Sequence, residues 1–96
     1  MSEKRFIILS TDFRELVDQK QFTGTLDRAI DWVQITPTTW LLWTSSSADV
    51  WYRRMKRYIK SGNRIFICAV DPDDRSGFMP ESFWDFIRSK TSSTST

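Results

Sequence analysis

The sequence predicts a single α+β domain, and three observations support this prediction. A chain of 96 residues has room for one domain. Unbroken apolar runs at residues 6–9 and 65–70 are rich in β-branched and aromatic side chains, which is typical of buried strands. Between these runs, apolar residues recur at helical spacing, with charged residues on the opposite side. The composition, 40% apolar and 27% charged, also indicates a folded rather than a disordered chain.

The first half of the chain predicts a strand, a helix and a second strand. The first strand is expected at residues 5–10. Asp12 then stands three residues before Glu15, the spacing of a helix N-cap, so a short helix or a loop is expected next. A clearer helix is expected at residues 25–33, followed by a short strand that ends at a turn around Pro37. The apolar stripe that predicts this helix consists of Phe22, Leu26, Ala29, Ile30 and Val33.

The second half predicts a strand, a helix, a strand and a further helix. The strand at residues 38–44 is apolar on both faces. A helix at residues 48–60 follows, capped by one of the serines before it and ended by Gly62 in a left-handed conformation. A strand at residues 65–70 and a turn-rich loop precede a last helix at residues 80–89.

This order of elements is that of a ferredoxin-like βαββαβ fold with an additional C-terminal helix. In that fold an antiparallel sheet carries two helices on one face. Right-handed connections place the first and third strands in the centre of the sheet. We therefore expect one ferredoxin-like domain over residues 1–90. Residues 91–96 are all serine or threonine and are expected to form a disordered tail.

Two helices leave the other face of such a sheet open. A face in contact with water predicts alternating apolar and polar residues, but the first, third and fourth predicted strands are apolar on both faces. Either a second copy of the chain or the C-terminal helix must therefore cover this face, and both can contribute together. A homodimer is the first expectation. The residues expected at such an interface are Trp40, Leu42, Trp43, Phe83, Trp84 and Phe86.

The residue types that are missing exclude several kinds of chemistry. The chain has no histidine and a single cysteine, Cys68. An intramolecular disulfide, a thiolate zinc site and a Ser-His-Asp triad are therefore excluded. No stretch of about eighteen apolar residues occurs, so no membrane span is expected, and the apolar run near the N-terminus is too short for a signal peptide. We expect a cytoplasmic protein without a cofactor.

Charged residues are unevenly distributed along the chain. Residues 50–70 contain six basic residues and no acidic one, which leaves eight basic and twelve acidic residues elsewhere. Most of the six lie on the polar side of the helix expected at residues 48–60, at a spacing that lets them meet successive phosphates of DNA or RNA. The alternatives are a solvated helix face and a surface that binds an acidic protein. The six residues are Arg53, Arg54, Lys56, Arg57, Lys60 and Arg64.

Three sequence features together suggest a relationship. The opening strand ends in aspartate (FIILSTD), a strand in mid-chain leads into a serine-capped helix (TTWLLWT), and a Gly/Asn turn leads into an apolar strand (SGNRIFI). In these features residues 5–70 resemble a group of small ferredoxin-like proteins. The group includes the CRISPR adaptation small subunit, the VapD-like toxins and the SinR-like proteins, and the likeness is closest to the SinR-like branch. The resemblance implies a homodimer that contacts nucleic acid. In some members it also implies a divalent-metal nuclease, tied to an aspartate at the position of Asp12.

Asp12 therefore has two interpretations. Its carboxylate suits Mg²⁺ or Mn²⁺ and would then be catalytic, or it is the N-cap of the following segment without a metal. One carboxylate binds such an ion weakly, and Asp71 is expected at the opposite end of the sheet. The second carboxylate would then have to come from the same position of a second copy, across a two-fold axis.

The leading hypothesis is a homodimer that binds nucleic acid through its basic helix without strong catalysis. A metal-dependent nuclease is one alternative. The other is a protein-binding inhibitor or adaptor module of a mobile element, and a larger protein complex is a further expected partner.

Overall fold

The computed structural model describes residues 3–13, 17–59 and 62–91. Within these ranges the chain forms four strands and three α-helices, with a short 3-10 turn after the second helix. In chain order the elements are β1 (Arg5–Asp12), α1 (Gln19–Leu26), β2 (Asp31–Thr36), β3 (Thr39–Thr44), α2 (Ala48–Met55), the turn η1 (Lys56–Tyr58), β4 (Arg64–Val70) and α3 (Glu81–Thr91).

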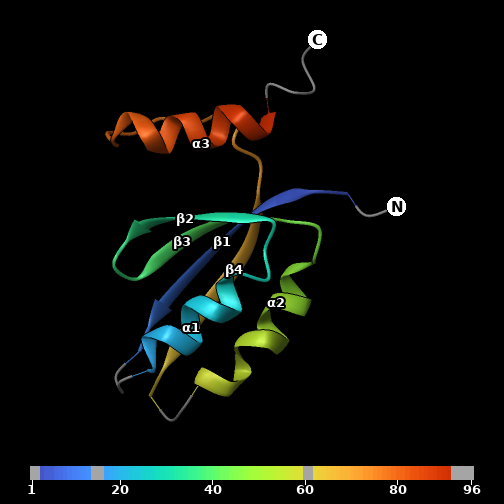
Figure 1. Ribbon diagram of the computed structural model, residues 1–96, viewed down its shortest axis with the longest axis vertical. Helices are drawn as coiled ribbons and strands as arrows, with labels where there is room; N and C mark the ends of the chain where they lie inside the picture. Colours follow the sequence, from blue (N-terminus) through green and yellow to red (C-terminus); the bar gives the residue numbers. More distant parts are fainter. Residues whose placement is uncertain (1–2, 14–16, 60–61, 92–96) are drawn as a thin grey trace.

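The strands form one antiparallel sheet between two helical layers. The strand order is β2-β3-β1-β4, so β1 and β3 lie in the centre. α1 and α2 lie on one face of the sheet and α3 on the other (Figure 1). The predicted α+β class with an antiparallel sheet is confirmed. No helix in the described part of the chain is long and apolar enough to cross a membrane.

The larger core lies between the sheet and the helices α1 and α2. Ile7 and Leu9 of β1 are fully buried there, because alternate residues of a strand point to the same face. Trp51 of α2 is also fully buried, and its indole Nε1 donates a 3.1 Å hydrogen bond to the hydroxyl of Thr44 at the end of β3. The other buried members of this core are Phe22, Leu26, Ala29, Trp40, Leu42, Met55 and Tyr58.

α3 covers the opposite face of the sheet. Phe83 and Ile87, one helical turn apart, form a second buried cluster with Phe6 of β1 and Leu41 of β3. Around this cluster lie the partly buried side chains of Ile8, Val33, Ile35, Trp43, Val70, Met79, Trp84 and Phe86. The C-terminal helix therefore covers the second face of the sheet, which is one of the two arrangements expected from the sequence.

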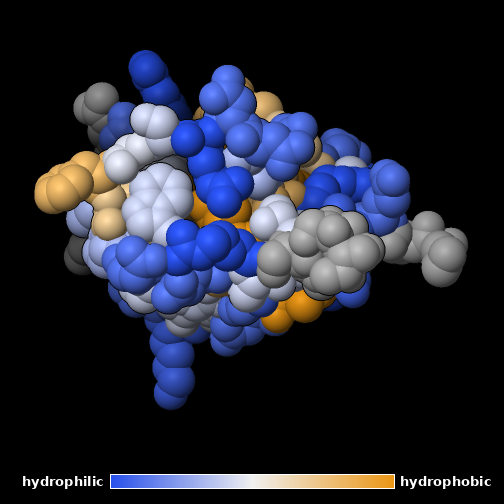
Figure 2. All heavy atoms as spheres, turned by 90° about the horizontal axis from the view of Figure 1, so that it is seen from above, coloured by the Kyte–Doolittle hydropathy of each residue, from blue (hydrophilic) through white to orange (hydrophobic). Residues whose placement is uncertain are grey.

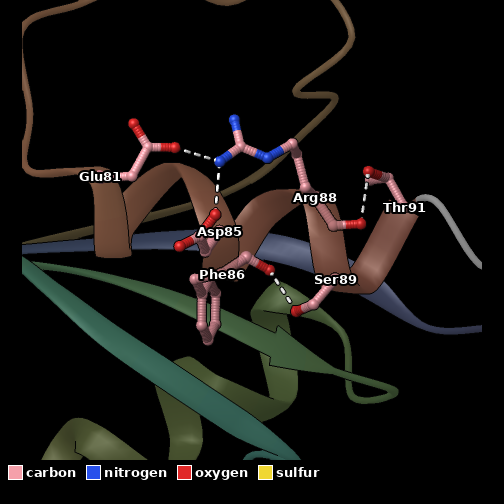
Figure 3. A network of polar contacts seen from close by, with 6 residues as sticks. All are labelled: Glu81, Asp85, Phe86, Arg88, Ser89 and Thr91. Carbon is pink, nitrogen blue, oxygen red and sulfur yellow. Dashed lines mark hydrogen bonds and ion pairs between the residues drawn. The ribbon is translucent and has the colours of Figure 1, made fainter.

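The two sides of α3 differ in chemistry. On its outer side Arg88 forms ion pairs with Asp85 and Glu81, and these carboxylates raise the pKa of the Arg88 guanidinium. Phe86 points away from them, toward the sheet (Figure 3). Seen from the α3 end, the molecule is mostly hydrophilic, with apolar residues in smaller areas between the polar ones (Figure 2). α3 thus presents charged residues to water and apolar residues to the sheet.

The helix predicted at residues 25–33 is wrong. The chain forms α1 at Gln19–Leu26 and β2 at Asp31–Thr36 instead. Ile30 is 55% exposed, and Val33 packs under α3 on the far face of the sheet. Pairing with β3 provides hydrogen-bond partners for the backbone of β2 and so stabilises a strand there. The spacing of apolar residues along the sequence does not reveal this pairing.

The N-cap predicted at Asp12 is also wrong. β1 runs further than expected, because its pairing with β4 continues until Asp12 lies opposite Arg64. α1 is capped by Asp18, whose carboxylate accepts a 3.1 Å hydrogen bond from the backbone N–H of Gln21. Glu15, the expected partner of an Asp12 cap, lies outside the described residues.

The boundaries after β3 differ less from the prediction. The side chain of Ser47 accepts a 3.2 Å hydrogen bond from the backbone N–H of Val50 and caps α2, as a serine was expected to do. Gly62 has φ of 87°, which confirms the predicted left-handed glycine. α3 includes Thr91, which had been assigned to the tail, and residues 92–96 lie outside the described residues.

Candidate nucleic-acid interface

α2 and η1 place most of the predicted basic residues on one side of the molecule. Trp51, Met55 and Tyr58 recur at helical spacing and are buried, so the residues between them face outward. Basic residues in the last turn of α2 also suit the partial negative charge of a helix C-terminus. We call this set the α2 surface, and it consists of Arg53, Arg54, Lys56 and Arg57.

Arg53 has a partner within its own helix. Its Nη2 atom lies 2.6 Å from Oδ2 of Asp49, one turn earlier, and both side chains are largely exposed. An exposed pair of this kind contributes less than about 1 kcal/mol to stability. The charge of Arg53 is therefore partly compensated in the free protein, but the pair can open for another anion.

The charged groups of Lys56 and Arg57 lie near aromatic rings. Each cation lies 6.0 Å from the centre of a tyrosine ring, Tyr52 and Tyr58 respectively. Neither forms an ion pair with any residue that the structure describes. Contacts of this length at an exposed site are weak, so both charges remain available to an external anion.

Arg54 is held differently from the other three. Its guanidinium carbon lies 4.8 Å from the centre of the Trp51 ring, and Nη1 is buried without a hydrogen-bond partner. Burial lowers the pKa of Arg54, and repulsion from Arg28 lowers it further. Arg54 is thus a cation partly withdrawn from water with no anion beside it among the described residues.

Arg28 is a basic residue of this site that the sequence analysis missed. It lies in the turn between α1 and β2, far from α2 in the sequence. Packing brings the two segments together, because the Tyr58 hydroxyl donates a 2.9 Å hydrogen bond to the Gln21 carbonyl and shares a 2.7 Å hydrogen bond with the Thr25 hydroxyl. Counting basic residues along the chain cannot detect a neighbour supplied by a distant segment of the sequence.

Of the two remaining predicted basic residues, the structure describes one. Lys60 lies outside the described residues. Arg64 begins β4, and the residue after it, Ile65, packs into the core beneath α1 and α2. Because neighbouring strand residues point to opposite faces, the side chain of Arg64 is directed to the other face of the sheet.

Asp12 lies on that same other face, directly opposite Arg64 in the pairing of β1 with β4. A shallow hollow at this end of the sheet is lined by Ser10, Thr11, Asp12, Arg64, Ile65 and Phe66. The described residues contain no group of three or more potential metal ligands. Arg64, the register partner of Asp12, adds a positive charge to the same face and opposes the approach of a metal cation, so the geometry is unfavourable for the metal site predicted at Asp12.

The predicted partner-binding residues are divided between the two cores. Trp40 and Leu42 are 7% and 0% exposed beneath α1 and α2, so they are not available to a partner. This corrects their assignment to an interface, and the reason is that their side of β3 faces the first helical layer. The other four residues belong to the cluster between α3 and the sheet, Trp43 from β3 and Phe83, Trp84 and Phe86 from α3.

No protein-family model, curated protein or solved structure matches this chain.

Proposed function

We propose that this chain is a ferredoxin-like domain that binds the phosphate backbone of nucleic acid. The ferredoxin-like assignment is supported by the order of the elements and by the central positions of β1 and β3. The helices α1 and α2 share one face of the sheet, as that fold requires (Figure 1). α3 is an addition on the other face.

The binding proposal rests on one observation, the uncompensated positive charge of the α2 surface. Lys56, Arg57 and Arg54 have no ion-pair partner in the part of the chain that the structure describes. An ordinary solvated helix carries both signs of charge, which interact at one-turn spacing. A row of cations without partners favours a polyanion, because binding releases the counterions of its phosphates.

The proposed function is tested by measuring the affinity of fluorescently labelled DNA and RNA oligonucleotides at several salt concentrations. The double variant Lys56→Glu/Arg57→Glu should bind at least about tenfold more weakly than the wild type at low salt, with a shallower salt dependence. The matched control is Lys4→Glu/Arg75→Glu, which changes the net charge equally at sites away from α2. Equal weakening in both double variants would show non-specific attraction and would contradict the proposal.

A homodimer remains a prediction, but the reason for it changes. α3 covers the face that had required a second copy. The outer edge of β4 instead faces no other strand among the described residues, and Phe66 on this strand is 65% exposed. An unpaired edge with an exposed aromatic residue is where a second copy would add its own strand.

We do not extend the proposal to metal-dependent cleavage. The pairing of Arg64 with Asp12 is a specific observation against cleavage. The resemblance to a group that includes nucleases does not by itself provide an arrangement of side chains that would support it. Docking on an acidic protein surface is the other alternative. It predicts retention of one protein partner after nuclease treatment, together with no oligonucleotide affinity.

A further inference from the structure

The α2 surface contains one cation whose environment is incomplete in the free protein. Nη1 of Arg54 is buried and makes no hydrogen bond. A buried charged group that lacks a hydrogen-bond partner costs folding free energy, so such groups are uncommon in native proteins. An arginine kept in this position therefore calls for an explanation in terms of what it binds.

The position of Arg54 is fixed by its surroundings. Its guanidinium lies over Trp51, which is fully buried and anchored by the hydrogen bond from its Nε1 to Thr44. Arg54 as a whole remains partly exposed, so its guanidinium lies on the indole at a position that is only partly withdrawn from solvent. A planar cation oriented in this way by an immobile ring loses little conformational entropy when it binds an anion.

Arg28, in the turn that follows α1, is the charged neighbour of Arg54 outside α2. The Tyr58 hydroxyl contacts the Thr25 hydroxyl. Arg54 lies one turn before Tyr58, and Arg28 lies one turn after Thr25. This contact therefore brings the segments that carry the two arginines together. α1 and α2 lie next to each other on the sheet (Figure 1). The two guanidinium groups repel each other in the free protein, which is one cause of the lowered pKa of Arg54.

We propose that Arg28 and Arg54 together bind one phosphate group, held between the two guanidinium groups. The inference rests on the proposed function only for the source of that group, which is then a phosphodiester of the bound nucleic acid. An anion between the two side chains turns their repulsion into two favourable charge-assisted contacts. The planar fork of arginine, which matches two phosphate oxygens at once, explains why arginine rather than lysine occupies both positions.

The first experimental arm uses inorganic phosphate as the probe. The melting temperature of the full chain is compared in phosphate and in chloride at equal ionic strength and pH. Phosphate should raise the melting temperature of the wild type, and Arg28→Gln and Arg54→Met should each remove this rise. The control Arg75→Gln, in the loop between β4 and α3 and outside the α2 surface, should keep it. Circular dichroism checks that each variant is folded, and Arg28→Gln affects an exposed turn residue that tolerates the change.

The second arm measures oligonucleotide affinity in the same variants. Arg28→Gln and Arg54→Met should each weaken binding about tenfold, and Arg75→Gln by no more than about twofold, since a hydrogen bond to a charged group is worth about one order of magnitude in affinity. No phosphate-specific rise in the wild type, or a rise retained in both variants, overturns the phosphate site. A rise without oligonucleotide binding supports the site and contradicts the proposed function. Oligonucleotide binding that depends on Lys56 and Arg57 but not on Arg28 or Arg54 supports the proposed function and contradicts the phosphate site.

Discussion

At the residue scale, the geometry of the α2 surface depends on Thr44, the one buried polar side chain among the described residues. Its hydroxyl accepts hydrogen bonds from Nε1 of Trp51 and from the backbone N–H of Ser46, each 3.1 Å long. The first bond fixes the indole that supports Arg54, and the second shapes the turn that leads into α2. One hydroxyl thus links the end of β3, the start of α2 and the candidate site.

Replacing Thr44 by valine should destabilise the protein by about 2 kcal/mol, because it leaves two donors without an acceptor in a site that is 2% exposed. The conservative control Thr44→Ser keeps the hydroxyl and should lose less. Urea denaturation followed by tryptophan fluorescence measures both variants. A valine variant as stable as the serine variant would show that these hydrogen bonds do not support the fold.

Arg54 should show opposite effects on stability and on binding. Methionine fills a similar volume over Trp51 without placing a charge in a partly desolvated position. In chloride buffer Arg54→Met should therefore unfold at a higher urea concentration than the wild type, although it binds phosphate more weakly. A variant that is less stable in chloride would indicate that the guanidinium is retained for its packing on the ring.

At the scale of secondary-structure elements, an apolar cluster and one ion pair attach α3 to the sheet within the described part of the chain. Lys90 Nζ lies 2.8 Å from Oδ2 of Asp31 at the start of β2. The apolar contribution is the larger of the two, because Phe83 and Ile87 are nearly inaccessible to solvent whereas the carboxylate is about half exposed. The two attachments can be tested separately.

The apolar attachment is tested by Ile87→Ala, which should cost about 3 kcal/mol of folding free energy. Ile87→Val, which removes one methylene group, should cost about 1 kcal/mol. Urea denaturation gives these values, and binding of a hydrophobic dye reports whether the second face of the sheet becomes exposed. Equal stability of the alanine variant and the wild type would mean that α3 is not docked in solution.

The ion pair makes the stability of the protein depend on pH. The hydrogen bond from Lys90 lowers the pKa of Asp31 below its usual value of 3.8, although partial burial acts in the opposite direction. A carboxylate with a lowered pKa in the folded state stabilises the protein above its unfolded pKa, and this stabilisation is lost as pH falls through the folded pKa. The contribution should be no more than about 0.5 kcal/mol, because the pair is partly exposed.

Asp31→Asn should therefore be slightly less stable than the wild type at pH 7, and the difference should disappear as the pH falls below about 4. Urea denaturation at several pH values measures it. A difference that stays constant down to pH 2 would show that Asp31 acts through its shape and not through its charge.

The elements also show which parts of the fold can be read from sequence. β3 and α2 are strongly marked, since Trp40–Trp43 is an apolar run and Ser47 precedes a clear amphipathic pattern. The boundary between α1 and β2 is not marked in the sequence. Ile30 and Val33 of the β2 region continue the helical stripe of Phe22, Leu26 and Ala29, so the spacing predicts one helix. The pairing of β2 with β3 decides between helix and strand there, and pairing is a long-range interaction.

The candidate site is divided in the same way. Arg53, Lys56 and Arg57 could be predicted because helical spacing alone places them together. Arg28 could not, since its proximity to Arg54 depends on how two helices pack. Arg64 was assigned to the same surface from its position in the sequence, but the alternation of β4 turns it to the other face.

At the scale of the whole molecule, we expect self-association to occur through the edge of the sheet rather than through its faces. Both faces carry helices, whereas β4 has a free edge among the described residues. Sedimentation equilibrium should detect a dimer at micromolar concentration that Phe66→Asp converts to monomer, because a charge on an edge strand opposes pairing with a second copy. The control Phe78→Asp adds the same charge at another exposed phenylalanine, outside the sheet. A monomeric wild type would contradict the dimer.

The position of α3 in the chain has a consequence for synthesis. All four strands precede α3, so a nascent polypeptide can complete the sheet before the helix that shields Phe6 and Leu41 has been translated. During that interval the growing chain exposes an apolar surface, and chaperones bind transient states of this kind. Premature termination within residues 71–80 would make that state permanent and yield a product prone to aggregate in the cell.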